Sequence, residues 1–302
     1  MRLTATLLAC VALTLGTAPL TARTPAKAKP AAIPSAIYTD PLPDKLHPAR
    51  MEVLHIPSGG VEINGVAYLA AGIGPHPTLV LCHGWPGNEK NLDLAQAVRR
   101  AGWNVVTFNY RGSWGSPGSF RFAQNPEDAR AVLAFLRQPD NARKLAVDPK
   151  RMALMGHSMG GWVSAMVGGN DQDLLGVGLI SAGNMGLVGT LDRASVIKEA
   201  ASDSESLAGT SPELMADELI ANRSAFDFNQ AARGLALHPF LALTSDDGLA
   251  GHTDSLVAAV RKAGGTRITT VHAATDHSWS DHRIFLEAQV INWLNSLLKG
   301  MC

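Results

Sequence analysis

The chain has 302 residues, 46% of them hydrophobic and 17% charged, which is the composition of a soluble globular protein with a sizeable core. Lys plus Arg and Asp plus Glu both number 26, so the formal net charge is zero. This balance leaves no basic excess to neutralise phosphates, and no nucleic-acid partner is expected.

Residues 1–22 are predicted to be a secretory signal peptide. Arg2 precedes an apolar run and then small residues up to Ala22, an order typical of exported proteins. The run is too short to span a bilayer, so no stable membrane insertion is expected after cleavage. The predicted location is therefore secreted or periplasmic. A lipid anchor on Cys10 is an alternative, although few apolar residues precede it.

Residues 23–50 are rich in proline and alanine and predict a linker or a loosely draped arm. Cys82 and Cys302 would remain after maturation, one in a predicted buried strand and the other at the C-terminus. A structural disulfide is therefore not expected, and the fold must be held by its core.

From residue 51 to 302 the apolar pattern predicts one domain in which strands and helices alternate. MEVLHI and VEINGVAYLA, separated by PSGG, predict an antiparallel hairpin. Further strands are predicted at 78–84, 104–110, 151–155, 174–181, 240–245 and 267–272, and helices at 91–102, 127–138, 159–166, 252–264 and 281–300. This alternation predicts the α/β class, with a mostly parallel, doubly wound sheet covered by helices on both faces.

A long insertion at 184–237 interrupts the alternation after the sixth predicted strand. Its SPELMADELIANR part predicts a helix with Ser211 as its cap and Pro212 in the first turn. The insertion occupies the place of a lid, and it would shape a pocket or form a passive surface excursion.

The hexapeptide GHSMGG places Ser158 at the turn from a strand into a helix. Gly156 and Gly160 flank it at two residues on either side, as a tight turn requires if strand and helix are to pack closely. We expect Ser158 to adopt a strained, positive-φ conformation with its hydroxyl above the sheet end, which is the geometry of a nucleophile.

A serine needs a base to take its proton and an acid to orient that base. His277 lies in the loop TDHSWSDH after the last predicted strand, whereas His272 ends that strand and His282 begins the last helix, so His277 is the predicted base. The turn TSDDGLA supplies the acid. Its spacing to the following helix favours Asp246, and Asp247 is the alternative.

The loop CHGWPG follows an earlier predicted strand and is expected to supply one amide of an oxyanion hole from Trp85. The second amide is expected from Met159, the residue after the nucleophile. No cofactor or metal site is predicted: the glycines at 112, 115 and 118 lack the pattern of a phosphate loop, and the histidines at 277 and 282 have no evident third ligand.

With these motifs in their order along the chain, the sequence resembles α/β-hydrolase fold serine hydrolases. NYRGSWGSPGSF followed by EDARAVLAFLR is similar to prolyl oligopeptidase-like and dienelactone hydrolase-like members. The resemblance implies Ser158 as nucleophile, His277 as base, Asp246 as acid, and Trp85 and Met159 as oxyanion donors. It implies a carboxylic ester or a short peptide as substrate. We expect an esterase, with a small peptidase or amidase, or a catalytically silent binding protein, as the alternatives.

Overall fold

A computed structural model describes residues 32–299. The predicted signal peptide at 1–22, Cys10 and Cys302 lie outside the described residues. Cys82 is a buried free thiol, and its burial raises its pKa to about 12.

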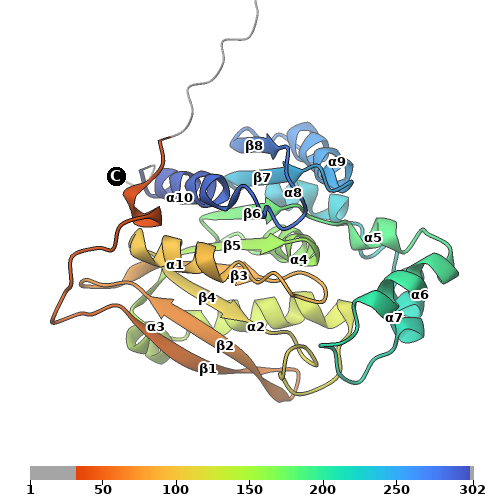
Figure 1. The fold of residues 1–302 in the computed structure, drawn as a ribbon, viewed down its shortest axis with the longest axis horizontal. Helices are drawn as coiled ribbons and strands as arrows, with labels where there is room; N and C mark the ends of the chain where they lie inside the picture. Colours follow the sequence, from red (N-terminus) through yellow and green to blue (C-terminus); the bar gives the residue numbers. More distant parts are fainter. Residues whose placement is uncertain (1–31, 300–302) are drawn as a thin grey trace, which may run out of the picture. The chain divides into compact units, whose positions relative to one another are not determined.

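One sheet of eight strands, in the order β1-β2-β4-β3-β5-β6-β7-β8, forms the centre of the domain (Figure 1). The strands are β1 (Arg50–Ser58), β2 (Val61–Leu69), β3 (His76–Cys82), β4 (Asn104–Phe108), β5 (Val147–His157), β6 (Gly176–Ile180), β7 (Phe240–Ser245) and β8 (Ile268–Ala273). The predicted hairpin is confirmed, because β1 pairs with β2 antiparallel, and β2 pairs with β4 in the same way. All other neighbours are parallel.

Helices cover both faces of the sheet, as the alternation predicts. They are α1 (Leu92–Arg100), α2 (Asn125–Arg137), α3 (Pro139–Lys144), α4 (Met159–Gly168), α5 (Met185–Val188), α6 (Arg193–Ser202), α7 (Pro212–Ala221), α8 (Ala232–Leu235), α9 (Ala250–Lys262) and α10 (Arg283–Lys299), with short 3-10 turns η1 (Ser35–Ile37), η2 (Phe122–Gln124) and η3 (Phe228–Ala231). Apolar side chains of α1 and α10 pack on one face, and those of α2, α4, α8 and α9 pack on the other. The predicted doubly wound α/β fold is thus confirmed.

The first described residues are attached to the domain. Arg100 on α1 donates to the carbonyl oxygens of Ala36 and Ile37 at 2.6 and 3.1 Å, and Asn292 on α10 donates to Ala32 O at 3.1 Å. Residues 32–37 of the predicted arm therefore lie against the two helices of one face.

The insertion contains α5, α6, α7 and η3 and is fastened to the loop after β4. Backbone hydrogen bonds join Trp114 N–H to Ser206 O and Phe120 N–H to Ala208 O, both at 2.9 Å. The helix α7 begins as predicted, with the Ser211 side chain accepting from Leu214 N–H. These contacts bring the insertion close to the carboxyl ends of the strands (Figure 1).

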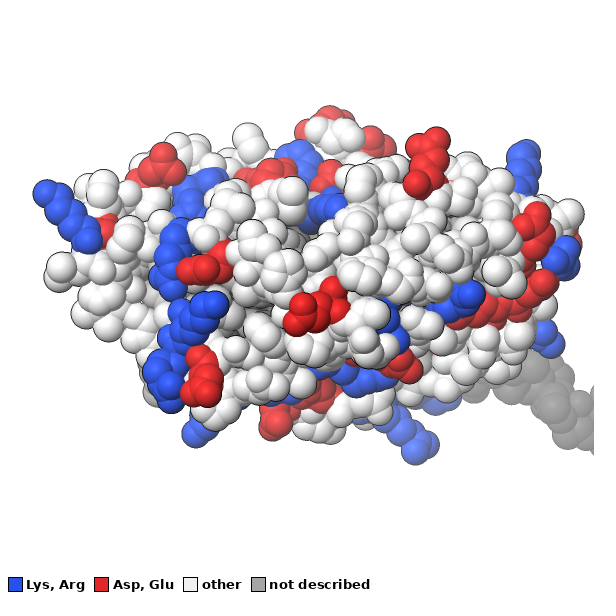
Figure 2. Space-filling model, turned by 90° about the horizontal axis from the view of Figure 1, so that it is seen from below, with Lys and Arg blue, Asp and Glu red and all other residues white. Residues whose placement is uncertain are grey.

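Basic and acidic side chains are intermixed on the face shown in Figure 2. Of the helices within 32–299, none combines the length and the apolar character needed to cross a bilayer.

Candidate active site

Ser158 occupies a sharp turn between β5, which ends at His157, and α4, which begins at Met159. Its backbone has φ 57° and ψ −123°, so the positive φ expected from the sequence is confirmed. The serine N–H donates to Ile180 O at 2.9 Å, and its carbonyl accepts from Gly161 N–H at 2.9 Å. Its hydroxyl makes no hydrogen bond to the residues between 32 and 299 and is free for chemistry.

The glycines around Ser158 are required by space. A Cβ on Gly156 would clash with the backbone of Gly160, and a Cβ on Gly160 would clash with the carbonyl of Cys82 and lie 2.6 Å from that of His83. A Cβ on Gly84 would lie 2.9 Å from Cβ of Ser158. The loop after β3 therefore approaches the serine as closely as its backbone allows.

His277 and Asp247 form a direct pair. Nδ1 of His277 lies 2.7 Å from Oδ2 of Asp247, whose side chain is only 3% exposed, while that of the histidine is 38% exposed. Nε2 of His277 has no hydrogen-bond partner among the described residues. The pair joins the loop after β7 to the loop after β8.

The sequence favoured Asp246 as the acid, but it is Asp247, the alternative, that contacts His277. Asp246 lies 3.0 Å from Nε2 of His272, and both side chains are more than half exposed. Both carboxylates belong to the turn that follows β7, where Asp246 contacts His272 and Asp247 contacts His277. Asp246 therefore faces the end of the neighbouring strand and solvent, and Asp247 faces His277.

The environment of Asp247 favours its charged form. Burial alone would raise the pKa of this carboxyl, but hydrogen bonds from His277 and from Leu249 N–H lower it below its ordinary value. The Leu249 N–H lies 2.9 Å from Oδ1. A carboxylate that stays ionised keeps Nδ1 of the histidine protonated and leaves Nε2 unprotonated to act as a base.

The loop that carries His277 is held by residues that the sequence did not single out. Trp279 Nε1 donates to Ser181 Oγ at 2.9 Å. Arg283 donates to Ser278 O at 2.9 Å and pairs with Asp93 of α1 at 2.7 Å between Nε and Oδ2. The Trp279–Ser181 and Arg283–Asp93 contacts join residues 98 and 190 positions apart, which no local motif reveals.

The two predicted oxyanion donors belong to segments that adjoin Ser158. Met159 is the first residue of α4, and Trp85 follows Gly84, whose backbone abuts the serine. Neither amide N–H donates to an acceptor within 32–299. The Trp85 indole packs edge-on against Phe122, with ring centroids 5.1 Å apart.

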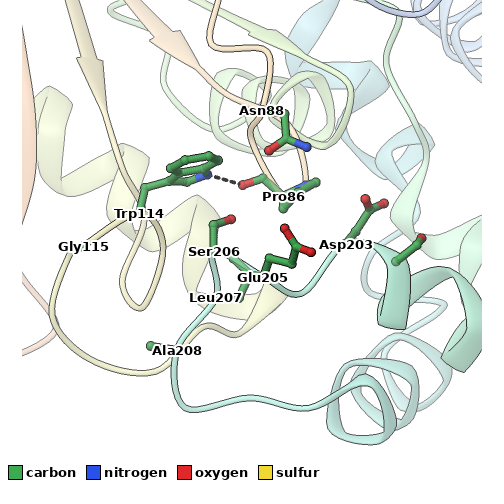
Figure 3. A pocket seen from close by; sticks show the side chains of 10 residues that line it. Pro86, Asn88, Trp114, Gly115, Asp203, Glu205, Ser206, Leu207 and Ala208 are labelled. Atoms are coloured by element: carbon green, nitrogen blue, oxygen red, sulfur yellow. Dashed lines mark hydrogen bonds between the residues drawn. The ribbon is translucent and has the colours of Figure 1, made fainter.

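A cavity of about 670 Å³ lies between the loops after β3 and β4 and the insertion (Figure 3). Pro86 and Trp114 form one side, joined by a hydrogen bond of 2.8 Å from the indole N–H to Pro86 O. Asp203 and Glu205 extend their carboxylates from the insertion. Burial and Glu199 raise the pKa of Asp203, and the charge of His277 opposes this rise.

The cavity thus borders the segment that follows Trp85. Ser158 is not among its lining residues. In the part of the chain that the structure describes, no three His, Cys, Asp or Glu side chains are grouped so that they could hold a metal ion.

Comparisons with known proteins identify the family and the fold. The model of the alpha/beta hydrolase family matches residues 79–291. An uncharacterized protein of Mycobacterium tuberculosis is 30% identical over 118 residues, which are 39% of this chain and 40% of that protein. The chain therefore spans less than half the length of this relative.

Two solved structures share the fold. A thermophilic carboxylesterase cloned from a metagenomic library, EstE1, has a TM-score of 0.63 at 22% identity, covering 87% of this chain and 92% of its own. An acylaminoacyl peptidase of Pyrococcus horikoshii has a TM-score of 0.64 at 14% identity, covering 82% of this chain and 41% of its own. With the family match over more than half of its length, and with a serine at the turn between β5 and α4, the chain belongs to the alpha/beta hydrolase family.

Proposed function

We propose that the protein is a serine hydrolase that cleaves carboxylic esters of small molecules through an acyl-enzyme. The observation that carries the proposal is the 2.7 Å pair of His277 and Asp247 in the loops beside a serine held at positive φ. The three groups stand in the order nucleophile, acid, base along the chain, as is usual for this architecture.

In the first half-reaction, Nε2 of His277 takes the hydroxyl proton as Oγ of Ser158 attacks the ester carbonyl carbon. The negative charge on the carbonyl oxygen is stabilised by the N–H groups of Trp85 and Met159. The bond to the alcohol oxygen then breaks, and His277 gives the proton to the departing alkoxide. In the second half-reaction a water attacks the acyl-enzyme with the same proton transfers and releases the acid.

The cavity is proposed to receive part of the substrate. Because the insertion at 184–237 forms one wall of the cavity, it would act as a lid-like element. The cavity is lined by Trp114, Leu207 and two carboxylates, which suits a small molecule with apolar and polar parts. The predicted signal peptide leads us to propose export, which N-terminal sequencing of the mature protein from culture medium and periplasm would test.

The experiment for the proposed function is labelling with a fluorophosphonate probe, followed by peptide mass spectrometry. We expect an adduct on Ser158 in the folded protein and none after heat denaturation or in Ser158→Ala. Turnover of p-nitrophenyl esters should vanish in Ser158→Ala while its melting temperature stays within a few degrees of the wild type.

Other results would change the assignment. Ester hydrolysis retained by pure Ser158→Ala contradicts the mechanism. Faster cleavage of aminoacyl anilides than of esters would assign a peptidase or amidase. No labelling of the folded protein would favour a binding protein that keeps the hydrolase fold without its chemistry.

A further inference from the structure

His157 is the last residue of β5, directly before the strained Ser158, and is only 3% exposed. Its Nε2 is 2.8 Å from the carbonyl oxygen of His277, and the two imidazole rings are tilted against each other with centroids 4.6 Å apart. The residue that precedes the proposed nucleophile thus contacts both the main chain and the side chain of the proposed base.

The acceptor determines the tautomer of His157. A carbonyl oxygen can only accept, so the proton of the neutral ring is on Nε2 and Nδ1 is unprotonated. Burial and, after it, the charge of His277 lower the pKa of His157 to about 4. Of the other charged groups that act on it, Arg283 favours the neutral ring and Asp247 the charged one. Near neutral pH, His157 therefore adds no positive charge beside His277.

A neutral neighbour matters because His277 becomes positively charged when it takes the proton of Ser158. A second cation at 4.6 Å would oppose that charge, whereas a neutral donor to the backbone does not. Nδ1 of His157 is buried and has no partner among the residues described, which is unfavourable for a polar atom. An apolar residue of the same shape would fill the space without this loss, so packing alone does not account for a histidine here.

We propose that His157 is a positioning residue for His277. Its Nε2–H holds the carbonyl of His277 and its ring limits the rotation of the imidazole, so that Nε2 of His277 stays directed at Ser158 while Asp247 holds Nδ1. The inference rests on the proposed function in taking His277 as the base.

Two variants separate the contribution of the Nε2–H donor of His157 from that of its aromatic ring. His157→Phe keeps an aromatic ring of similar volume and removes the donor, while His157→Gln returns an amide donor near the place of Nε2. We expect kcat for p-nitrophenyl acetate to fall about tenfold in His157→Phe with KM within about twofold of the wild type, and to return to within about threefold in His157→Gln.

His238 provides a matched control. It is also 3% exposed, its Nδ1 lies 3.1 Å from the carbonyl oxygen of Leu174, and its Nε2 is buried without a partner in the described chain. His238→Phe removes an equivalent buried hydrogen bond and should lower the melting temperature while leaving kcat unchanged. If His157→Phe does not fold, His157→Asn, whose amide is too short to reach the carbonyl, takes its place.

A second measurement does not depend on turnover. The Nδ1 proton of His277 bound to Asp247 should give a low-field proton NMR resonance, assigned by its loss in His277→Gln. It should broaden or shift in His157→Phe and stay unchanged in His238→Phe. Absence of Ser158 labelling in the wild type would reject the proposed function and leave this measurement valid. An unchanged resonance together with unchanged kcat in His157→Phe, or equal losses in His157→Phe and His157→Gln, would overturn the positioning role.

Discussion

Among single residues, the adjacent carboxylates of Asp246 and Asp247 differ most clearly in their surroundings. Asp247 is enclosed and bound to His277, whereas Asp246 is exposed and bound to His272. Charge and residue type are the same, so the two carboxylates differ only in their burial and in the histidine that each contacts. The pair supplies its own matched control for mutagenesis.

Asp247→Asn should lower kcat by about 10⁴, because the amide cannot hold the histidine in the required tautomer. Asp246→Asn should change kcat by less than about threefold, since its partner is exposed and not the base. Steady-state hydrolysis of p-nitrophenyl acetate by the two variants measures this. The reverse ranking would return the role of acid to Asp246.

Asp247 should also make stability depend on pH. Its folded-state pKa is lowered, so the stability it contributes is present above its unfolded pKa of about 4 and is lost as the pH falls through the folded value. Chemical denaturation of the wild type and Asp247→Asn should give free energies of unfolding whose difference shrinks as the pH is lowered below about 4. A difference independent of pH would show that the carboxylate is not stabilised by folding.

At the scale of elements, the insertion and the loop after β4 act together. The two hydrogen bonds from Trp114 and Phe120 to the insertion, and the bond from the Trp114 indole to Pro86, connect three segments around one cavity. Substrate preference is therefore expected to depend on side chains of the insertion that line the cavity.

Ala208→Trp is expected to fill part of the cavity. KM for a long-chain p-nitrophenyl ester should rise about tenfold, a steric cost of about 1.4 kcal/mol, while KM for the acetate changes little. Ala194→Trp, on an exposed position of α6 away from the cavity, is the control and should leave both values unchanged. Equal effects on both esters would place the substrate elsewhere.

The order of elements was predictable from the sequence, but their side-chain contacts were not. Glycines at 156 and 160 reveal the turn at Ser158, because the crowding that requires them is local. The direction of Asp247 depends on where β7 ends, which hydrophobic periodicity leaves uncertain by a residue or two. The roles of His157 and Arg283 depend on partners 120 and 190 residues away, and the short helix α6 carries no strong apolar stripe.

At the scale of the whole molecule, a buried ion pair ties the hairpin, the loop after β4 and α2 together. Asp128 is fully buried and accepts from Ser58 Oγ at 2.5 Å, from Arg111 N–H at 2.9 Å and from Arg111 Nε at 2.6 Å. Burial raises the pKa of this carboxyl, and its three donors oppose the rise. The Arg111–Asp128 pair therefore fixes the loop after β4, which also carries Trp114, to helix α2.

Asp128→Ala should lower the free energy of unfolding by about 3–5 kcal/mol, because the largely buried Arg111 would lose its buried partner and keep only the exposed carboxylate of Glu127. Glu127→Gln removes the other carboxylate bound to Arg111, which is 56% exposed, and should cost less than about 1 kcal/mol. Urea denaturation compares them. A loss below 1 kcal/mol in Asp128→Ala would show that the pair contributes little.

The walls of the cavity and the proposed catalytic groups occupy different parts of the chain. Residues 202–208 and the loops around Pro86 and Trp114 border the cavity, whereas Ser158, Asp247 and His277 stand at strand ends. Substitutions in the first set alter which molecule fits without moving the second. A library randomised at 202–208 should therefore retain its reactivity toward a small fluorophosphonate, while its members differ in the esters they accept. By the same route, relatives of this chain could acquire different substrates and still inherit the same reaction.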